Sequence, residues 1–330
     1  MTTSKHAFAR LAAMGLWLLR SEELVLFLSL VYCCLLLPVA PGLVSVDNLV
    51  NLVSSLLPLL IVSVGQTIVL ITGGIDLSVT SLIALTSITG AALINADTGL
   101  LGHSTLATPV GLAAMVFLGG LLGAGNGAAI TRFQMPPFIV TLTTMMFYSG
   151  LAVWLTHSKN IGHLPAAFNA IGASVGPSLA VTALVVFLAQ VGLSRSLWGR
   201  WLYMLGHNRK AALISGVPVE ATVLSAYAVS GVCAALASIL YTGRLETGSP
   251  VLGQRILLDV IGATVIGGTS LYGGKGKILW TVYGALYLTL LDNSLNLLNL
   301  SFSSIMMAKG GVILCAALLD AARHRLLSST

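Results

Sequence analysis

The sequence predicts an all-α integral membrane protein, built as a bundle of about ten transmembrane helices. Three observations predict this fold class: the composition, the succession of apolar runs and the distribution of basic residues. Of the 330 residues, 56% are apolar and 8% are charged, and the mean hydropathy is +0.97. A soluble domain carries about 25% charged residues, because its surface faces water. We therefore expect the surface of this chain to face lipid.

Ten apolar runs come close to the length of about 20 residues that a helix needs to cross a bilayer. The first run follows a basic N-terminus, but it is longer than the apolar part of a signal peptide and no small-residue cleavage site follows it, so we expect an uncleaved helix. The eighth is short and rich in glycine, which would suit a broken or re-entrant helix. Together they predict one transmembrane domain over residues 1–330. The predicted spans are 24–40, 50–71, 77–95, 109–130, 137–156, 175–192, 221–242, 258–272, 278–297 and 303–319.

The basic residues test this count, because Lys and Arg gather in cytoplasmic segments. If both termini are cytoplasmic and the spans alternate, the outside segments hold only Lys159, Arg244 and Arg255, and Lys309 falls within a span. The bias predicts an even number of spans with both termini in the cytoplasm, and it explains the net charge of +6 without nucleic-acid binding. The cytoplasmic basic residues would be Lys5, Arg10, Arg20, Arg132, Arg195, Arg200, Arg209, Lys210, Lys275, Lys277, Arg323 and Arg325.

The segment between the second and third spans carries a compact polar motif, Ile71-Thr-Gly-Gly-Ile-Asp-Leu-Ser78. Gly73 and Gly74 permit a tight reversal, and Asp76 could cap the third helix through its free N–H groups. A role for Asp76 at a substrate gate is the alternative. In the fourth span, Gly119, Gly123 and Gly127 recur every four residues, which predicts close packing against another helix.

The loop of about 193–220, between the sixth and seventh spans, contains signals for a short helix. Asn208 could start this helix, Gly216 could end it, and Pro218 would open the next one. A short cytoplasmic helix flanked by glycines would suit docking on a partner, whereas an ordinary basic loop is the alternative.

Two charged residues are predicted within the membrane, where charges are costly and usually paired or functional. Asp292 and Lys309 lie at similar distances from the loop near Leu300, so we expect an ion pair, with a proton-coupling role as the alternative. Asp259 lies near the end of the eighth span and could cap it or pair with Arg255.

Polar uncharged residues within the spans could line a pathway for a polar solute or could equally bridge helices. The sequence contains no phosphate-binding G-x-x-x-x-G-K-[ST] motif and no H-E-x-x-H or G-x-S-x-G motif, so we expect neither ATP hydrolysis nor hydrolase chemistry from this chain. No cofactor and no metal are expected. The pathway candidates are Asn51, Ser54, Gln66, Asn126, Thr141, Thr144, Asn293 and Asn296.

Three motifs in order give the chain a family resemblance over roughly residues 49–320. They are the run Thr72–Val79, the loop Gly206–Val217, and Leu258-Asp259 followed by Val265–Leu271 and Gly273–Gly276. This pattern resembles the permeases of bacterial ATP-binding-cassette (ABC) importers of the ribose, xylose and arabinose type. Thr80 departs from it, where a glycine is usual. The motif residues are Gly73, Gly74, Asp76, Ser78, Asp259, Gly267, Gly268, Gly273 and Gly274; the coupling-loop residues are Gly206, Asn208, Ala211, Ala212, Ser215, Gly216, Val217 and Glu220.

The resemblance implies an ABC importer permease fold in the bacterial inner membrane. It implies a dimer with a second permease, identical or paralogous, around a central pathway for a sugar. It also implies a cytoplasmic ATPase subunit, which uses the ATP and receives the coupling loop, and a periplasmic sugar-binding protein. A secondary transporter, with coupling acids at the midplane, and a passive channel, with a filter motif, remain the alternatives.

Overall fold

The computed structural model describes residues 24–102 and 104–328, which form helices and one isolated antiparallel bridge between Ile161 and Gly248. The first helices are α2 (Leu24–Leu36), the 3₁₀ helix η1 (Pro41–Val44), α3 (Val46–Ile71), α4 (Val79–Ile94), α5 (Ala107–Arg132), α6 (Pro137–Thr156), α7 (Ala166–Ala173) and α8 (Val175–Arg195). They are followed by α9 (Leu197–His207), α10 (Arg209–Ile214), α11 (Val219–Leu245), α12 (Leu257–Gly267), α13 (Ile278–Leu297) and α14 (Phe302–Ser328).

Each of the ten predicted spans coincides with one helix, and the all-helical membrane fold is confirmed. Five of the described helices, α3, α5, α6, α8 and α11, are long and apolar enough to cross a membrane by themselves. The orientation of the termini stays a prediction. Lys5, Arg10 and Arg20, on which it partly depends, lie outside the described residues.

Two spans and one loop differ in extent from the prediction. The first helix ends at Leu36, before the 3₁₀ turn that carries Pro41. The eighth span is a half-length helix, since α12 ends at Gly267 and Gly268 adopts a φ of +107°, a backbone conformation that suits glycine. The loop predicted over 193–220 is largely helical, because α9 and α10 occupy most of it.

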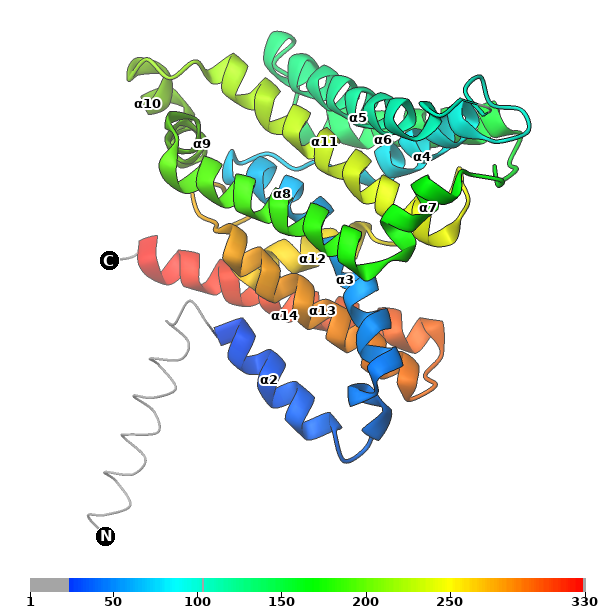
Figure 1. The fold of residues 1–330 in the computed structure, drawn as a ribbon. Helices are drawn as coiled ribbons and strands as arrows, with labels where there is room; N and C mark the ends of the chain where they lie inside the picture. Colours follow the sequence, from blue (N-terminus) through cyan, green and yellow to red (C-terminus); the bar gives the residue numbers. More distant parts are fainter. Residues whose placement is uncertain (1–23, 103, 329–330) are drawn as a thin grey trace.

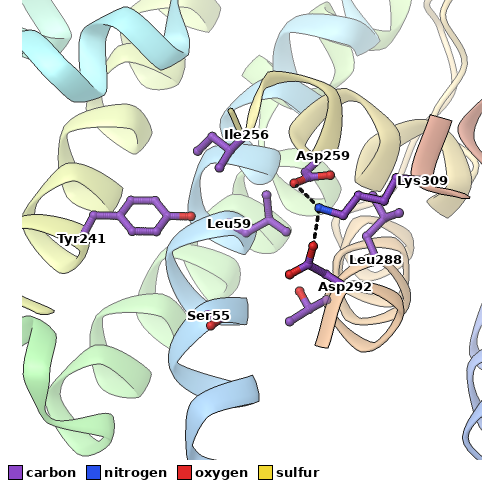
Figure 2. A pocket seen from close by; sticks show the side chains of 9 residues that line it. Ser55, Leu59, Tyr241, Ile256, Asp259, Leu288, Asp292 and Lys309 are labelled. Carbon is purple, nitrogen blue, oxygen red and sulfur yellow. Dashed lines mark hydrogen bonds and ion pairs between the residues drawn. The ribbon is translucent and has the colours of Figure 1, made fainter. Parts of the chain in front are cut away.

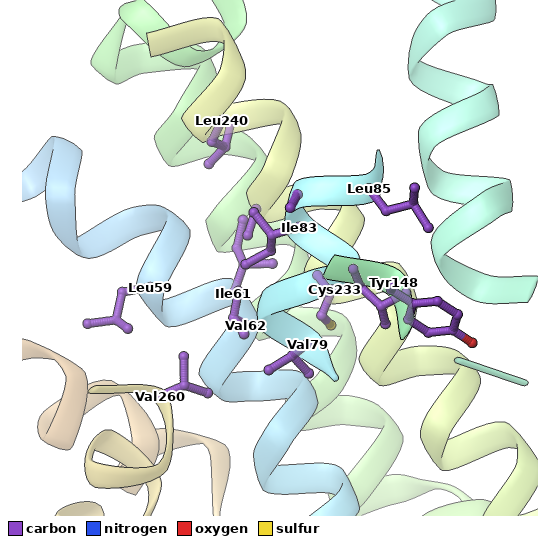
Figure 3. Close-up of a cluster of buried hydrophobic side chains, with 14 of the residues drawn as sticks. Leu59, Ile61, Val62, Val79, Ile83, Leu85, Tyr148, Cys233, Leu240 and Val260 are labelled. Carbon is purple, nitrogen blue, oxygen red and sulfur yellow. The ribbon is translucent and has the colours of Figure 1, made fainter. Parts of the chain in front are cut away.

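The helices form two groups joined by the long helix α3. Figure 1 shows α4, α5 and α6 together on one side of α11, and α12, α13, α14 and α2 together on the other side of the molecule. The main hydrophobic core lies where α3, α4 and α11 meet. Figure 3 shows Ile61, Val62, Ile83 and Leu240 converging there, and all four side chains are buried.

The glycine ridge of α5 packs against α11, as its four-residue spacing predicts. A Cβ on Gly119 would meet the carbonyl oxygen of Gly231, and one on Gly123 would meet that of Tyr227. Gly127 similarly faces the backbone of Leu224. Backbone against backbone at this distance leaves no room for any side chain, so glycine is needed along the whole crossing.

Candidate functional site

We call residues 193–220, which contain α9 and α10, the coupling segment, and both of its short helices are capped. The Ser196 hydroxyl accepts a hydrogen bond from the Gly199 N–H at 3.0 Å at the start of α9. The Asn208 Oδ1 accepts from the N–H groups of Lys210 and Ala211, both at 3.0 Å, at the start of α10. The predicted helix start at Asn208 is therefore confirmed, with the side-chain oxygen satisfying two otherwise unpaired donors.

The end of α10 is also as predicted. Gly216 has a φ of +78°, and its N–H donates to the carbonyl of Leu213 at 3.1 Å. The N–H of Val217 donates to Ala212, after which Pro218 leads into α11. This left-handed closure reverses the chain within three residues, so α10 forms a compact projection.

The projection has an inner face and an outer face. Ala212 and Val217 are buried, and they belong to a cluster that also contains Tyr227. Leu213 and Ile214 are 66% and 87% exposed. The other coupling-loop residues Ala211, Ser215, Gly216 and Glu220 are exposed as well. Figure 1 shows α10 at a corner of the bundle, next to α9.

Glycines from the three sequence motifs meet beside α9. The Gly274 N–H donates to the Ile71 carbonyl at 2.9 Å, and a Cβ on Gly206 would collide with that same carbonyl. A Cβ on Gly273 would lie 2.8 Å from Cα of Gly73. We call Gly73, Gly206, Gly273 and Gly274 the glycine crossing. It ties the coupling segment to the C-terminal end of α3 and to the loop between α12 and α13.

Other contacts reinforce this crossing. The Tyr203 hydroxyl of α9 donates to the Gly276 carbonyl at 2.7 Å. A Cβ on Gly74 would lie 2.5 Å from the Tyr227 hydroxyl, and one on Gly267 would meet the Trp280 carbonyl. A displacement of α9 must therefore move α3 and the α12–α13 loop with it, because their backbones are in direct contact.

Asp76 lies at the centre of a buried hydrogen-bond network, and the prediction that it caps the third helix is wrong. Its Oδ1 accepts from the N–H and the hydroxyl of Ser78, at 3.0 and 2.6 Å, and its Oδ2 accepts from the Ser230 hydroxyl at 2.9 Å. The Asn126 amide donates to the Ser78 hydroxyl at 2.8 Å. Asp76 thus joins its own loop to α11 directly and to α5 through Ser78. It accepts from the N–H of Ser78, the residue before α4, and not from an N–H within α4.

The predicted pathway residues separate into two sets, and the first set lies in helix packing. Thr141 is buried and donates to the Ile75 carbonyl at 3.1 Å, whereas Thr144 bonds within its own helix. Ser54 likewise donates to Val50 in its own helix. Gln66 is fully buried on α3, and neither atom of its amide has a hydrogen-bond partner among the described residues.

The second set, Asn51, Asn293 and Asn296, bonds to residues outside the first set. The Asn51 side chain accepts from Arg244 at 2.6 Å, and Asn293 exchanges two hydrogen bonds, of 2.9 and 2.8 Å, with Asn48. The Asn296 amide donates to the carboxylate of Asp292 at 3.2 Å. These residues face one another across α3, α11 and α13.

The predicted ion pair between Asp292 and Lys309 is confirmed, with a distance of 2.6 Å between carboxylate and ammonium. Lys309 also contacts Asp259 at 2.9 Å, as Figure 2 shows. The prediction that Asp259 caps α12 or pairs with Arg255 is therefore wrong. Arg255 lies over the ring of Phe302, at 4.9 Å from its centre. We call Asp259, Asp292 and Lys309 the charged triad.

A cavity of about 120 Å³ adjoins the charged triad. Its other walls come from α3 and α11, and Figure 2 shows the hydroxyl of Tyr241 directed from α11 toward Leu59 and the triad. Sequence reasoning missed both Arg244 and Tyr241 as members of this region. The one available signal was the placement of Arg244 near the end of an apolar run, which the charge count assigned to an outside loop.

Comparison with known proteins gives a consistent set of matches. The family model described as "Branched-chain amino acid transport system / permease component" matches residues 48–317. The "Ribose import permease protein RbsC" of Escherichia coli (strain K12) is 35% identical over 92% of this chain and 94% of its own length. The protein of the same name from Bacillus subtilis is 37% identical over 83% and 84%. No solved structure matches this chain.

A relative named for another sugar is similar too. The "D-allose transport system permease protein AlsC" of Escherichia coli (strain K12) is 33% identical over 79% of this chain and 79% of its own length. The family-model match, over residues 48–317, includes the coupling segment, the glycine crossing and the charged triad.

Proposed function

This chain belongs to the branched-chain amino acid transport system / permease component family, and from that premise we propose that it is the membrane-spanning subunit of an ATP-driven monosaccharide importer. The relatives over most of the chain are named as permease proteins for ribose and allose. We place the subunit in the bacterial inner membrane, with α9 and α10 on the cytoplasmic side.

The observation that carries this proposal is the exposed apolar tip of α10. Leu213 and Ile214 stand out from a helix that is otherwise fixed by its caps and by the buried Ala212. An exposed apolar pair on a rigid projection is suited to insertion into a groove of a partner protein. We infer that this partner is the ATPase subunit.

Motion of the ATPase would reach the membrane helices through the glycine crossing. The chain lacks a phosphate-binding loop of its own, so ATP would be bound and hydrolysed by the partner, with no cofactor held here. A push on α10 would be passed through α9 to α3 and to the α12–α13 loop, because no side chain separates these backbones. Rigid-body rocking of helices between two states is a common form of such coupling.

Two further partners belong to the proposal. A second permease copy or a paralogue would complete a dimer around the pathway, and a periplasmic sugar-binding protein would deliver the solute. The charged triad supports an importer over a proton-coupled transporter, since Asp292 is held by Lys309 and is not a free acid.

The change Ile214→Ser tests the docking role. It removes an apolar contact from a side chain that is 87% exposed, so the permease should fold normally but should retain less ATPase. Loss of one such anchor residue from an interface typically costs about 2 kcal/mol or more. The measurement is the amount of ATPase that co-purifies with the tagged permease from membranes.

Leu100→Ser provides a matched control, because Leu100 is 90% exposed in the loop that joins α4 to α5. This variant should retain the ATPase in full. Equal retention by both variants would contradict the docking role of α10. Solute flux by the permease alone, driven by a gradient, would instead support a secondary transporter or a channel.

A further inference from the structure

We propose that the cavity beside the charged triad is a binding site for one monosaccharide ring. We call it the polar pocket, and define it by Ser55, Tyr241, Asp259, Thr289, Asp292 and Lys309. The inference rests on the proposed function and adds to it the place where this chain would hold the solute.

The side chains that line the polar pocket can form further hydrogen bonds. Each carboxylate of the triad uses one oxygen for Lys309, the Oδ2 of Asp259 and the Oδ1 of Asp292. An ionised carboxylate offers about four acceptor positions, so both retain capacity to accept from hydroxyl groups. Ser55, Tyr241 and Thr289 line the same cavity. The Ser55 hydroxyl accepts from Arg244 and can still donate, and the Thr289 hydroxyl donates to the Ala285 carbonyl and can still accept.

The charged side chains at the polar pocket balance one another. Arg244 stands beside the pocket and donates to the Ser55 hydroxyl at 3.0 Å and to Asn51 at 2.6 Å. Two carboxylates, Asp259 and Asp292, thus lie near two cations: Lys309 contacts both of them, and Arg244 lies beside the pocket. A charged solute would add an uncompensated charge to this set, whereas a neutral polyol can bond to the groups as they stand. The balance favours an uncharged hydroxylated solute over an amino acid or an ion.

The volume of the polar pocket fits a small solute. An apolar cavity of about 150 Å³ is known to hold one benzene ring. The polar pocket, at about 120 Å³, is smaller than that, so it limits the solute to one ring, whose hydroxyl groups would extend beyond the pocket. The side chains of Leu59, Ile256 and Leu288 form the apolar part of the wall, which a ring can contact with its C–H groups.

Polar groups continue along the two helices, α3 and α13, that flank the pocket. On α3, Asn48, Asn51 and Ser55 are spaced as one helical face, and on α13 so are Thr289, Asp292 and Asn296. Helix interiors within a membrane rarely carry such rows unless they face protein or water. The rows extend the pocket toward the end of α13 and provide a polar approach to it.

Solute protection of a cysteine is the first test. Thr289→Cys would be made in a chain whose Cys33, Cys34, Cys233 and Cys315 are replaced by Ser, and assembled with the ATPase in vesicles. A small water-soluble thiol reagent should label Cys at position 289. Saturating D-ribose or D-allose should slow this labelling at least threefold, and L-leucine should not.

Leu100→Cys in the same background is the control, and its labelling should be unaffected by either sugar. If the cysteine at position 289 is not labelled, the pocket is closed to water, and the proposal is overturned. Labelling slowed by L-leucine but by neither sugar would overturn the assignment of the ligand.

Removal of single hydroxyls is the second test. Thr289→Val and Tyr241→Phe should each lower sugar uptake by the complete complex about three- to tenfold, the range expected when one hydrogen bond to the solute is lost. The loss should be smaller for a deoxy sugar that lacks the bonded hydroxyl, which a merely structural role would not produce.

Thr143→Val is the matched control, because both threonine hydroxyls donate to the carbonyl four residues earlier, at 2.8 Å, but Thr143 is exposed on α6. It should transport normally. A wild-type complex that takes up neither sugar would overturn the proposed function, and with it the ligand. A wild type that takes up one sugar, with normal uptake by Thr289→Val and Tyr241→Phe, would overturn the pocket alone.

Discussion

The glycine crossing and the polar pocket both contact α3, one at its C-terminal end and one nine residues from its start. Ile71 and Ser55 are sixteen residues apart (71 − 55), about 24 Å along a helix. In the crossing, backbones touch, and a Cβ on Gly206 or Gly273 would collide with the facing backbone. In the pocket, long side chains from α3, α11, α12, α13 and α14 surround a cavity.

The difference between these regions suggests a division of labour. Backbones in contact transmit displacement with little loss, because packed interiors deform very little. Side chains around a cavity can instead exchange hydrogen bonds with a solute. The region next to α10 is thus built to move as one piece, and the region next to Arg244 is built to bind.

The largest effect on stability is expected for Lys309→Met. This change leaves the carboxylates of Asp259 and Asp292 facing each other without a cation, and the Lys309 side chain is 10% exposed. Removal of one partner from a buried ion pair typically costs about 3–5 kcal/mol. Thermal unfolding of the purified protein in detergent would measure the loss. If the change proved neutral, the charged triad would be no more than a surface contact.

A smaller effect is expected for Gly206→Ala in the glycine crossing. The new methyl group would meet the Ile71 carbonyl, which cannot move without loss of its hydrogen bond from Gly274. Overpacking of this kind typically costs about 1–3 kcal/mol. The same unfolding measurement applies, and coupling of ATP hydrolysis to uptake should fall as well.

Gly125→Ala is the control for the crossing, since a Cβ at this helical position on α5 would meet nothing within 4 Å. It should be neutral or stabilising by up to about 1 kcal/mol, from helix propensity alone. Equal destabilisation by both alanines would mean that helix context, and not the crossing, decides the result.

The smallest effect separates the two acids of the triad. Asp259→Asn should destabilise more than Asp292→Asn, by about 1 kcal/mol, because the Asp259 side chain is 16% exposed and that of Asp292 is 44% exposed. At position 292, water can replace part of the interaction with Lys309 that is lost with the carboxylate. Unfolding of the two variants side by side would test this ranking, and the reverse order would place the pocket's opening on the side of Asp259.

Local signals predicted single turns better than contacts between helices. Gly73 and Gly216 mark turns that need a left-handed backbone, and such turns are visible in a sequence. Asn208 was recognisable as a helix start for a similar reason. The partner of Asp259 was not, because Lys309 is fifty residues away on another helix and Arg255 was the nearest cation in the chain.

By itself, the sequence determined that this protein lies in a membrane, where its ten spans lie, and that α10 is a short capped helix. Apolar spans and capping residues can be recognised from residues that are close together in the sequence. Only the tertiary structure decided that the three glycine motifs meet, that Asp76 joins α5 to α11, and that Lys309 is shared by two acids. The physical reason is the same in each case. Which faces of the helices touch depends on how all of them pack together, and that information is not carried by any single segment.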